Sequence, residues 1–275
     1  MRSSNRKKTR RWVLLALRLR NDGVKSVVLK RWGRVKRYWA INNYFIGRVV
    51  ELLGNQIDTH GVKLSVDNPS ILTHRKSQIF FHLYEKDEIL AVQKYLQPDL
   101  PVIELGAGIG LLSCFINKRL DKPENHIVLE ANPELLPTLK RNRRLNNCKF
   151  DIKQGALGYG SDLLSLHIAE FTGSSLYPAS DNAIQVPGVS LELLMANSRF
   201  TTTSLIVDIE GGEVDLIENE ISILQEKVKA FFFEMHLNWI GNSRMEAMEK
   251  TLDDAGFRFV EQFGKTYYFE NQQLR

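Results

Sequence analysis

From residue 101 onward, short runs of apolar residues alternate with longer segments whose apolar residues recur at helical spacing. Each run is about four to eight residues long and rich in Val, Ile, Leu and Phe, which is typical of buried strands. Strands that alternate with helices indicate a parallel sheet with helices on both faces. The predicted strands are PVIEL (101–105), HIVLE (126–130), KFDIKQGAL with its turn (149–157), SLHIAE (165–170), SLIVDIE (204–210), KAFFFEMH (229–236), and a closing pair, FRFVEQF (257–263) and KTYYFEN (265–271).

Helices are expected between these strands and ahead of them. The helix over 133–147 begins with Pro133 and holds Pro137 in its first one or two turns, where proline is tolerated. Gly256 is a natural cap for the end of the last helix. Residues 49–75 mix Gly, Asn, Asp and Pro with short apolar stretches, which predicts a small β-rich segment. The other predicted helices are EKDEILAVQKYL (85–96), LLSCFINKRL (111–120), one from about Glu213, and SRMEAMEKTLDDAG (243–256).

Charge divides the chain into a basic arm and a mildly acidic body. Residues 1–48 hold fifteen Lys or Arg and one acid, a net charge of +14, whereas the remaining 227 residues carry a net charge of −9. In the arm the cations are interleaved with Trp12, Trp32, Tyr38 and Trp39. This pattern is compatible with a peripheral contact with anionic membrane lipid or another polyanion. Because runs of charge are usually solvated, a solvated, partly disordered leader with some edge strand is the main alternative. Nucleic-acid binding is a third interpretation, which we disfavour.

Composition excludes several classes of protein. The apolar run Trp12–Leu17 is far shorter than the roughly 20 residues of a membrane-spanning helix. Because the run is also too short for an export signal and no small-residue cleavage site follows it, we expect a cytoplasmic protein, with the arm as the part available for a peripheral membrane contact. The two cysteines, Cys114 and Cys148, exclude a disulfide scaffold and a four-cysteine zinc site, and we expect both to be small buried apolar residues. Composition leaves the oligomeric state open.

The sharpest local motif is a glycine loop, VIELGAGIG (102–110), which follows a strand and opens a helix. Its glycines, Gly106, Gly108 and Gly110, allow a tight turn and a close approach of the backbone to a ligand. Dinucleotide enzymes carry G-x-G-x-x-G, which would require glycine at Leu111. The G-x-G-x-G spacing instead favours S-adenosylmethionine (SAM), which has no pyrophosphate. A nicotinamide-dependent oxidoreductase on a similar sheet is the alternative.

Two acids accompany the glycine loop. Glu104 lies at the end of the strand before the loop, where it can meet the positive end of the methionine moiety of SAM, directly or through water. Glu130 ends the second strand, where an acid can accept hydrogen bonds from both ribose hydroxyls. The ribose role is shared by dinucleotide and SAM sites, so Glu130 does not discriminate between these two cofactors.

A second group of acids closes two later strands. Asp208 and Glu210 end one strand, and Glu234 and His236 end another. If the two strands are neighbours, four titratable groups meet at one edge of the sheet. Packed acids raise one another's pKa, which suits a general base near neutral pH. Oxygen-rich clusters also bind Mg²⁺ or Mn²⁺, and His236 can be a structural histidine, but we predict general-base chemistry without a metal.

The chain resembles the FkbM family of SAM-dependent methyltransferases over about residues 80–270. The family more often has Asp where Glu104 stands and Asn where Gly108 stands. The segments that carry the resemblance are LYEKDE (83–88), with Tyr84, Glu85 and Glu88 in the family's YE-x-x-E element, VIELGAGIG (102–110), VLEANP (128–133), LIVDIEGGE (205–213) and FFFEMH (231–236).

The resemblance implies a class I methyltransferase fold, Rossmann-like, with a seven-stranded, mostly parallel sheet, helices on both faces and one reversed strand near the edge. Together with the charge pattern, it divides the chain into the basic arm (1–48), which lies outside the resemblance, a segment with the YE-x-x-E element (49–98) and the methyltransferase domain (99–271). It also implies SAM as the cofactor and methyl transfer to a hydroxyl oxygen of a sugar, glycan or natural product. An inactive methyltransferase fold that binds partners through its basic arm is the alternative.

The residues that we expect at the site fall into two sets. The cofactor set is Glu104, Gly106, Gly108, Gly110, Glu130 and Ala156, the last of these in the turn after the third strand. The catalytic set is His236, Asp208, Glu210 and Glu234, and we assign no metal ligand.

Overall fold

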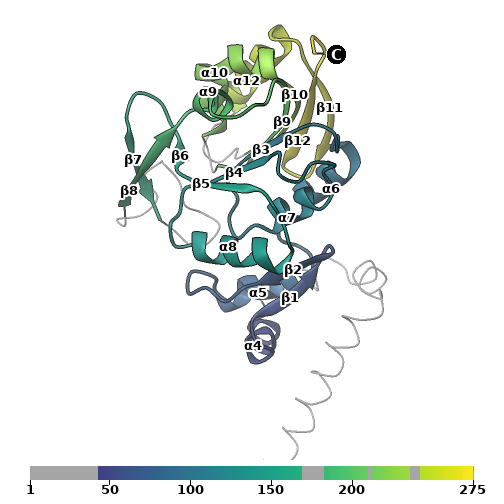
Figure 1. Cartoon of the computed structure of the whole chain (residues 1–275), viewed down its shortest axis with the longest axis vertical. Helices are drawn as coiled ribbons and strands as arrows, with labels where there is room; N and C mark the ends of the chain where they lie inside the picture. Colours follow the sequence, from purple (N-terminus) through teal and green to yellow (C-terminus); the bar gives the residue numbers. More distant parts are fainter. Residues whose placement is uncertain (1–42, 169–182, 210–211, 236–241, 275) are drawn as a thin grey trace, which may run out of the picture.

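The computed structural model describes residues 43–168, 183–209, 212–235 and 242–274 (Figure 1). Nearly all of the basic arm predicted over 1–48 lies outside these residues, as do Glu210 and His236 of the predicted catalytic set. No helix in the described part of the chain is long and apolar enough to cross a membrane.

The centre of the structure is a seven-stranded sheet with the strand order β11-β12-β10-β9-β3-β4-β5. Its neighbours pair in parallel except around β12, which runs antiparallel to both β10 and β11. The sheet confirms the predicted mostly parallel class I methyltransferase architecture with one reversed strand beside the edge. The strands are β3 (Val102–Leu105), β4 (His126–Glu130), β5 (Asp151–Gln154), β9 (Thr203–Val207), β10 (Val228–Glu234), β11 (Phe257–Phe263) and β12 (Thr266–Asn271).

Helices cover both faces of this sheet and create two hydrophobic cores (Figure 1). Successive side chains of a strand point to opposite faces. Phe232 accordingly packs in one core, while Phe231 and Phe233 pack in the other, and all three are at most 1% exposed. The first core is closed by α6 (Lys86–Tyr95), α7 (Leu111–Asn117) and α8 (Leu136–Leu145), and the second by α9 (Leu191–Ala196), α10 (Glu213–Lys227) and α12 (Asn242–Asp254).

Ahead of the sheet, the predicted β-rich segment contains a hairpin and two helices. The hairpin, β1 (Gln56–Thr59) and β2 (Val62–Ser65), lies between α4 (Tyr44–Leu52) and α5 (Thr73–Phe80). The predicted boundary after residue 48 therefore falls inside α4. We did not predict α4, whose first turn is capped by the Asn43 side chain through bonds from the Phe45 and Ile46 amides.

Asn142 of α8 fastens this N-terminal segment to the rest of the molecule. Its side-chain oxygen accepts from the Ser65 amide at 2.7 Å, and its amide group donates to the carbonyl oxygens of Ser65 and Ile109. One buried side chain thus joins β2 to the glycine loop that precedes α7.

The structure differs from two details of the expected pattern. The helix predicted from Pro133 begins at Leu136, because the Asn132 side chain accepts from the Glu134 amide and forms a turn before it. A second sheet of three strands, in the order β6-β8-β7, stands apart from the main one. Of its strands β6 (Ala156–Leu157), β7 (Leu163–His167) and β8 (Ala183–Val189), the last was not predicted.

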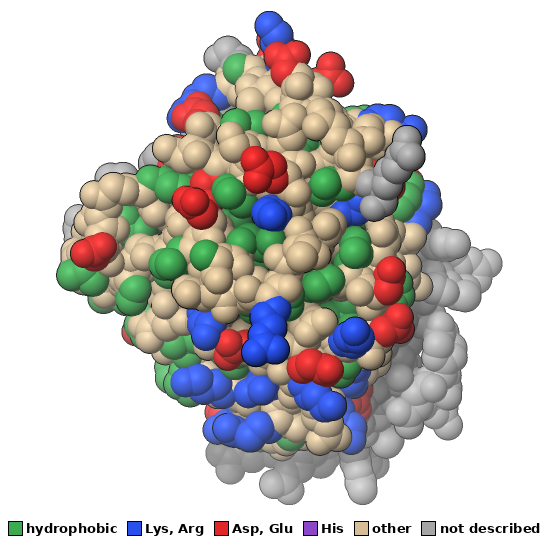
Figure 2. Space-filling model, turned by 45° about the horizontal axis from the view of Figure 1, so that its top comes forward, with side chains coloured by type: hydrophobic (Ala, Val, Ile, Leu, Met, Phe, Trp, Pro, Cys, Tyr) green, Lys and Arg blue, Asp and Glu red, His purple; other side chains and the backbone are tan. Residues whose placement is uncertain are grey.

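Basic side chains are unevenly distributed over the described residues. The helix α8 has the sequence LPTLKRNRRL, with four cations among ten residues. In Figure 2, Lys and Arg side chains gather in the lower part of the face shown, toward the end of the molecule where Figure 1 places α8 and α4. The start of the described chain and this concentration of positive charge therefore lie at the same end.

Candidate active site

The glycine loop lies at the carboxyl end of β3, tightly packed between neighbouring elements. Gly106, Gly108 and Gly110 have φ values of +90°, +54° and +83°, which side chains of L-residues rarely allow. A Cβ on Gly106 would lie 1.8 Å from the carbonyl oxygen of Asp208, and one on Gly110 would lie 2.4 Å from the side chain of Leu139. Both the backbone angles and the lack of space therefore require glycine.

Glu130, the last residue of β4, fixes one side of the loop. One of its carboxylate oxygens accepts from the Gly108 amide and the other from the Asn132 amide, each at 2.7 Å. The residue is 6% exposed, and burial raises the pKa of its carboxyl to about 7, although the two amides act to lower it. Each oxygen keeps a further lone pair for a ligand hydroxyl. The position fits the predicted ribose contact.

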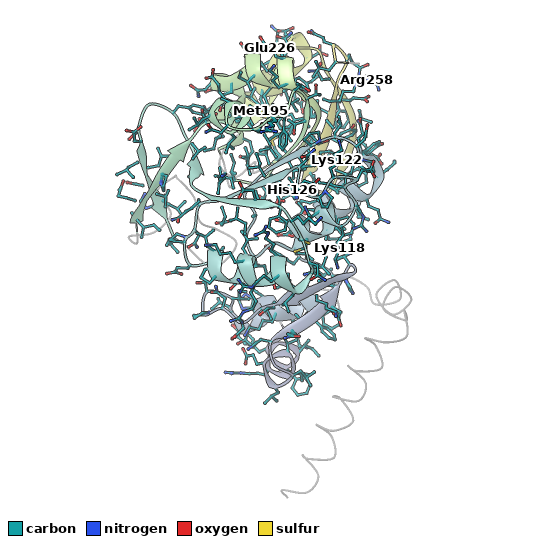
Figure 3. All side chains as sticks on the ribbon, viewed as in Figure 1. Lys118, Lys122, His126, Met195, Glu226 and Arg258 are labelled. Carbon is teal, nitrogen blue, oxygen red and sulfur yellow. The ribbon has the colours of Figure 1, made fainter. Side chains whose placement is uncertain are left out.

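Glu104, which we predicted to contact the methionine moiety of SAM, is almost completely buried. It is 1% exposed, and its two oxygens pair with the Ser113 hydroxyl at 2.8 Å and the His126 ring at 3.1 Å. Ser113 belongs to α7, and His126 begins β4 in the interior of the molecule (Figure 3). Glu104 therefore ties the helix after the loop to the sheet, while its contact with a cofactor stays a prediction.

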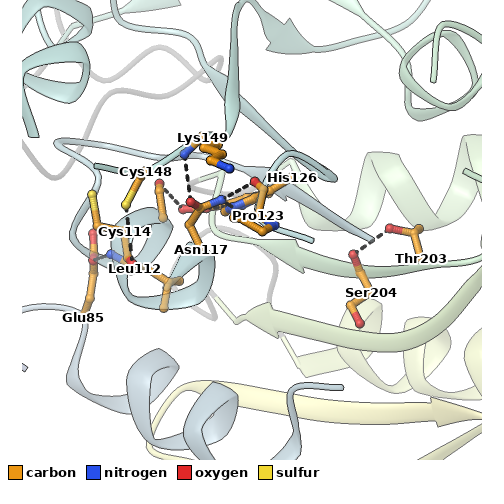
Figure 4. Close-up of polar contacts among 12 residues, drawn as sticks. Glu85, Leu112, Cys114, Asn117, Pro123, His126, Cys148, Lys149, Thr203 and Ser204 are labelled. Atoms are coloured by element: carbon orange, nitrogen blue, oxygen red, sulfur yellow. Dashed lines mark hydrogen bonds and ion pairs between the residues drawn. The ribbon is translucent and has the colours of Figure 1, made fainter. Parts of the chain in front are cut away.

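The segment before α6 supplies two side chains that the sequence analysis assigned to no site. A Cβ on Gly108 would lie 2.9 Å from the Tyr84 hydroxyl, so Tyr84 stands directly against the loop. Glu85 has a left-handed backbone with φ of +48°, and its carboxylate accepts from the Leu112 amide at 2.8 Å (Figure 4). Glu85 thereby satisfies a free amide in the first turn of α7.

Several acids surround the Tyr84 hydroxyl. Burial raises the pKa of Tyr84 well above its usual range, and the charges of Glu85, Asp208 and Glu130 raise it further. Burial likewise raises the pKa of Glu85 to about 8, against the hydrogen bond from Tyr84. Tyr84 thus lies within electrostatic reach of the predicted cofactor residue Glu130 and of the predicted base Asp208. The YE-x-x-E element is the feature of the sequence that could have pointed to Tyr84 and Glu85. The spacing of its residues does not show which distant residues they contact.

The predicted neighbouring strands carry Asp208 and Glu234 to the same edge of the sheet. Val207 pairs with Phe233 across β9 and β10, so Asp208 and Glu234 occupy equivalent positions. The Asp208 amide donates to the Leu105 carbonyl at 2.9 Å, which holds this strand end against β3 and the glycine loop. Two of the four predicted catalytic residues are therefore placed at adjacent strand ends.

Glu88, from the same YE-x-x-E element, lies against Glu234. The Thr266 hydroxyl donates to Glu88 at 2.9 Å, and Lys265 forms an ion pair with Glu234 at 3.2 Å. Burial raises the pKa of Glu88 to about 7, and the charge of Glu234 raises it further. Glu88, Glu234, Thr266 and Phe233 lie together here and leave no room for a water molecule. The Glu88 carboxyl is therefore partly protonated near neutral pH.

Ala156 is the last of the predicted cofactor residues to be placed. Ala156 begins β6, is 6% exposed, and follows Gly155, whose amide donates to the Glu130 carbonyl at 3.1 Å. It therefore lies close to the end of β4.

Within the described residues, which leave out Glu210 and His236, no three His, Cys, Asp or Glu side chains are grouped so that they could hold a metal ion.

Comparison with solved structures finds low similarity. A methyltransferase from Pyrococcus furiosus is 11% identical, covers 86% of this chain and 98% of its own, and has a TM-score of 0.46. A ribosomal protein L11 methylase from Lactobacillus delbrueckii is 15% identical, with coverages of 69% and 79% and a TM-score of 0.41. Aeropyrum pernix fibrillarin, solved with bound SAM, is 10% identical, with coverages of 66% and 73% and a TM-score of 0.37. No curated protein matches the chain.

Because these TM-scores lie below 0.5, we assign the chain to a family only from its match to a family model. The family model described as the methyltransferase FkbM domain matches residues 104–259, more than half of the 275-residue chain. The matched region contains the three glycines of the loop, Glu130, Asp208 and Glu234, whose geometry is given above. It begins after Tyr84 and Glu85, so the segment that closes over the loop lies outside the match. The chain belongs to the FkbM methyltransferase family.

Proposed function

We propose that this protein binds SAM at the carboxyl ends of β3 and β4 and methylates a hydroxyl oxygen of a sugar, glycan or natural product. The observation that carries the proposal is the Glu130 carboxylate, held by the Gly108 and Asn132 amides beside the glycine loop. An acid at the end of the second strand can accept both ribose hydroxyls of a nucleoside. The acceptor class rests on the resemblance to the family.

The charges at the site fit a positively charged ligand. Glu85, Glu130 and Asp208 all act on Tyr84, so three acids face one small region beside the loop. SAM supplies a methyl group on a positively charged sulfur and carries an ammonium group as well. A cation placed among these carboxylates relieves their mutual repulsion, whereas a dinucleotide would add the negative charge of its pyrophosphate.

Asp208 and Glu234 are the described residues that can take the proton of the acceptor. A hydroxyl oxygen that gains a methyl group must lose its proton, and a carboxylate within hydrogen-bond reach accepts it. Asp208 follows β9 at the loop, and Glu234 ends β10 beside it. Tyr84, whose hydroxyl lies against Gly108, is the side chain that we expect to orient the two reactants.

The direct test measures SAM binding by calorimetry and then labelled methyl transfer onto extracts of the source cell. We expect SAM to bind and NADH not to bind, because Leu111 stands where a dinucleotide site has its third glycine. Binding of NADH without binding of SAM would overturn the proposal. A hydroxyl compound recovered with the label would identify the acceptor.

Removing the Glu130 carboxylate should weaken SAM binding. Hydrogen bonds to a charged group contribute on the order of 1–3 kcal/mol, so Glu130→Ala should lower the affinity by about 5- to 150-fold in calorimetry. Glu134→Ala is the matched control, since the exposed Glu134 lies four residues further on and its carboxylate accepts from the Ser70 hydroxyl. Unchanged affinity in Glu130→Ala would contradict the cofactor site.

SAM binding should release protons and strengthen as pH rises. In the free protein the pKa of Glu130 is raised to about 7 and that of Glu85 to about 8, so both carboxyls are partly protonated near neutral pH. A bound cation favours the carboxylates and lowers both pKa values. The complex then holds fewer protons than the free protein, so affinity should rise from about pH 6 to about pH 8 and level off above this window.

Calorimetry in buffers of different ionisation enthalpy measures this proton release directly. Glu85→Gln should reduce the number of protons released, while Glu218→Gln, a change at an exposed acid of α10, should not. A SAM affinity that stays constant between about pH 6 and pH 9 would contradict the placement of the cation beside these acids.

We also propose that the basic arm contacts an anionic membrane surface. The helix α4, which contains the last residues of the arm, exposes Tyr44, Phe45 and Leu52, of which Leu52 is 86% exposed. We expect the full chain to pellet with phosphatidylserine vesicles at low salt and to be released at high salt, because each cation near the surface contributes about 1 kcal/mol that salt screens. A chain that begins at Asn43 should pellet less. Equal pelleting of the two chains would contradict the role of the arm.

A further inference from the structure

The chain's two cysteines lie side by side, although they are 34 residues apart in the sequence. Cys114 is in α7, and Cys148 is in the segment between α8 and β5. The Cys148 sulfur lies 3.9 Å from the Cys114 carbonyl oxygen (Figure 4) and 3.8 Å from the Asn146 carbonyl oxygen, and the Cys114 thiol donates to the Cys148 sulfur. Cys114 is fully buried, as predicted, whereas Cys148 is partly exposed, which corrects the expectation that both are buried.

The surroundings make the two thiols unequal. The hydrogen bond from Cys114 lowers the pKa of Cys148, and the charges of Lys118 and Arg143 lower it further, although burial acts in the opposite direction. The same hydrogen bond and burial raise the pKa of Cys114. Lys118 follows α7 directly and donates to the Gly61 carbonyl, which keeps its ammonium group near this surface (Figure 3). The thiolate therefore forms on the accessible Cys148.

We propose that Cys148 and Cys114 form a peroxide-sensitive thiol pair, in which Cys148 is oxidised first and Cys114 closes a disulfide. The Cys148 thiolate attacks hydrogen peroxide and breaks its O–O bond, which gives a sulfenic acid and hydroxide. The Cys114 sulfur then attacks the sulfenic sulfur, the S–O bond breaks, and the oxygen leaves as water. Two thiols and one peroxide thus become one disulfide and two waters.

The disulfide would act on the glycine loop through a short connection. The Cys114 amide donates to the Gly110 carbonyl at 3.1 Å, and this bond links Cys114 in α7 to the last glycine of the loop. A disulfide requires the sulfurs to approach to about 2 Å and restrains the two segments that carry them, so any adjustment of α7 passes to the residues bonded to it. Gly110 is packed against Leu139 and has little space in which to follow. This consequence rests on the proposed SAM site.

The experiment treats the reduced full chain with hydrogen peroxide and counts free thiols. We expect both thiols to disappear, with recovery by dithiothreitol, and peptide mapping to join residue 114 to residue 148 within one chain. In Cys114→Ala, the oxidation should stop at a sulfenic acid on Cys148 that dimedone traps. In Cys148→Ala, Cys114 should stay reduced, because its thiol is buried and protonated. Two thiols that stay free under peroxide, or disulfides between chains only, would overturn the thiol pair.

SAM calorimetry on the reduced and oxidised protein then tests the connection to the loop. The disulfide form should bind SAM about 5- to 150-fold more weakly, the usual range of a coupling between two sites, with recovery on reduction. Equal affinities of the two forms would overturn the connection. Failure of the reduced protein to bind SAM would instead contradict the proposed function, because disulfide formation is measured without SAM.

Discussion

Asp208→Asn should lower the rate of methyl transfer by about 10²- to 10⁴-fold, the contribution of a general base, while SAM binding changes little. The variant keeps the shape of the side chain and removes the charge that accepts a proton. Its backbone position is fixed by the bond from its amide to Leu105 and by the close contact of its carbonyl with Gly106. The change should therefore leave the glycine loop in place. Single-turnover kinetics with labelled SAM separate the chemical step from binding.

Glu234→Gln tests the second described member of the predicted base cluster, and His236→Ala tests a member outside the described residues. Glu218→Gln is the control, since that acid is 58% exposed and pairs with Arg244 at the surface. A drop below about tenfold in both Asp208→Asn and His236→Ala would contradict general-base catalysis by this cluster. Loss of activity in a chelator, restored by Mg²⁺, would favour the metal alternative.

Gly106→Ala should reduce turnover by about 10²-fold or more, because a displacement of about 1 Å in a catalytic site costs this much. The added Cβ would lie 1.8 Å from a backbone oxygen, that of Asp208, which cannot rotate aside as a side chain can. The loop and the end of β9 must then separate, and they carry the predicted cofactor and base residues respectively. We expect SAM affinity to fall together with turnover.

Gly61→Ala is the matched control for this substitution. Gly61 has a φ of +79°, close to the +90° of Gly106, but a Cβ there would meet nothing within 4 Å. Both variants carry the strain of a left-handed backbone, on the order of 1–2 kcal/mol. Only the Gly106 variant carries the steric overlap as well. Similar loss of SAM binding in both variants would show that backbone strain, rather than contact between loop and strand, explains the effect.

The sheet could be predicted closely because its signals are local. The Phe231–Phe233 run predicts a buried strand without any information about the rest of the fold, since continuous apolar residues are typical of a strand covered on both faces. The glycine loop is equally visible, because left-handed backbone at Gly106 and Gly110 excludes most other residues. By contrast, α4 and the start of α8 depend on side-chain caps and turns that compete with the periodic pattern, so their bounds were missed or shifted.

The sequence by itself determined the fold class, the loop and the acids at the strand ends. Only the tertiary structure decided how these groups face one another. It turned the Glu104 carboxylate inward to Ser113 and His126, and it brought Glu85 to an amide 27 residues away. Spacing along the chain fixes which face of a strand or helix a residue occupies. Contacts between distant segments depend instead on how whole elements pack, and this packing placed the YE-x-x-E element over the loop.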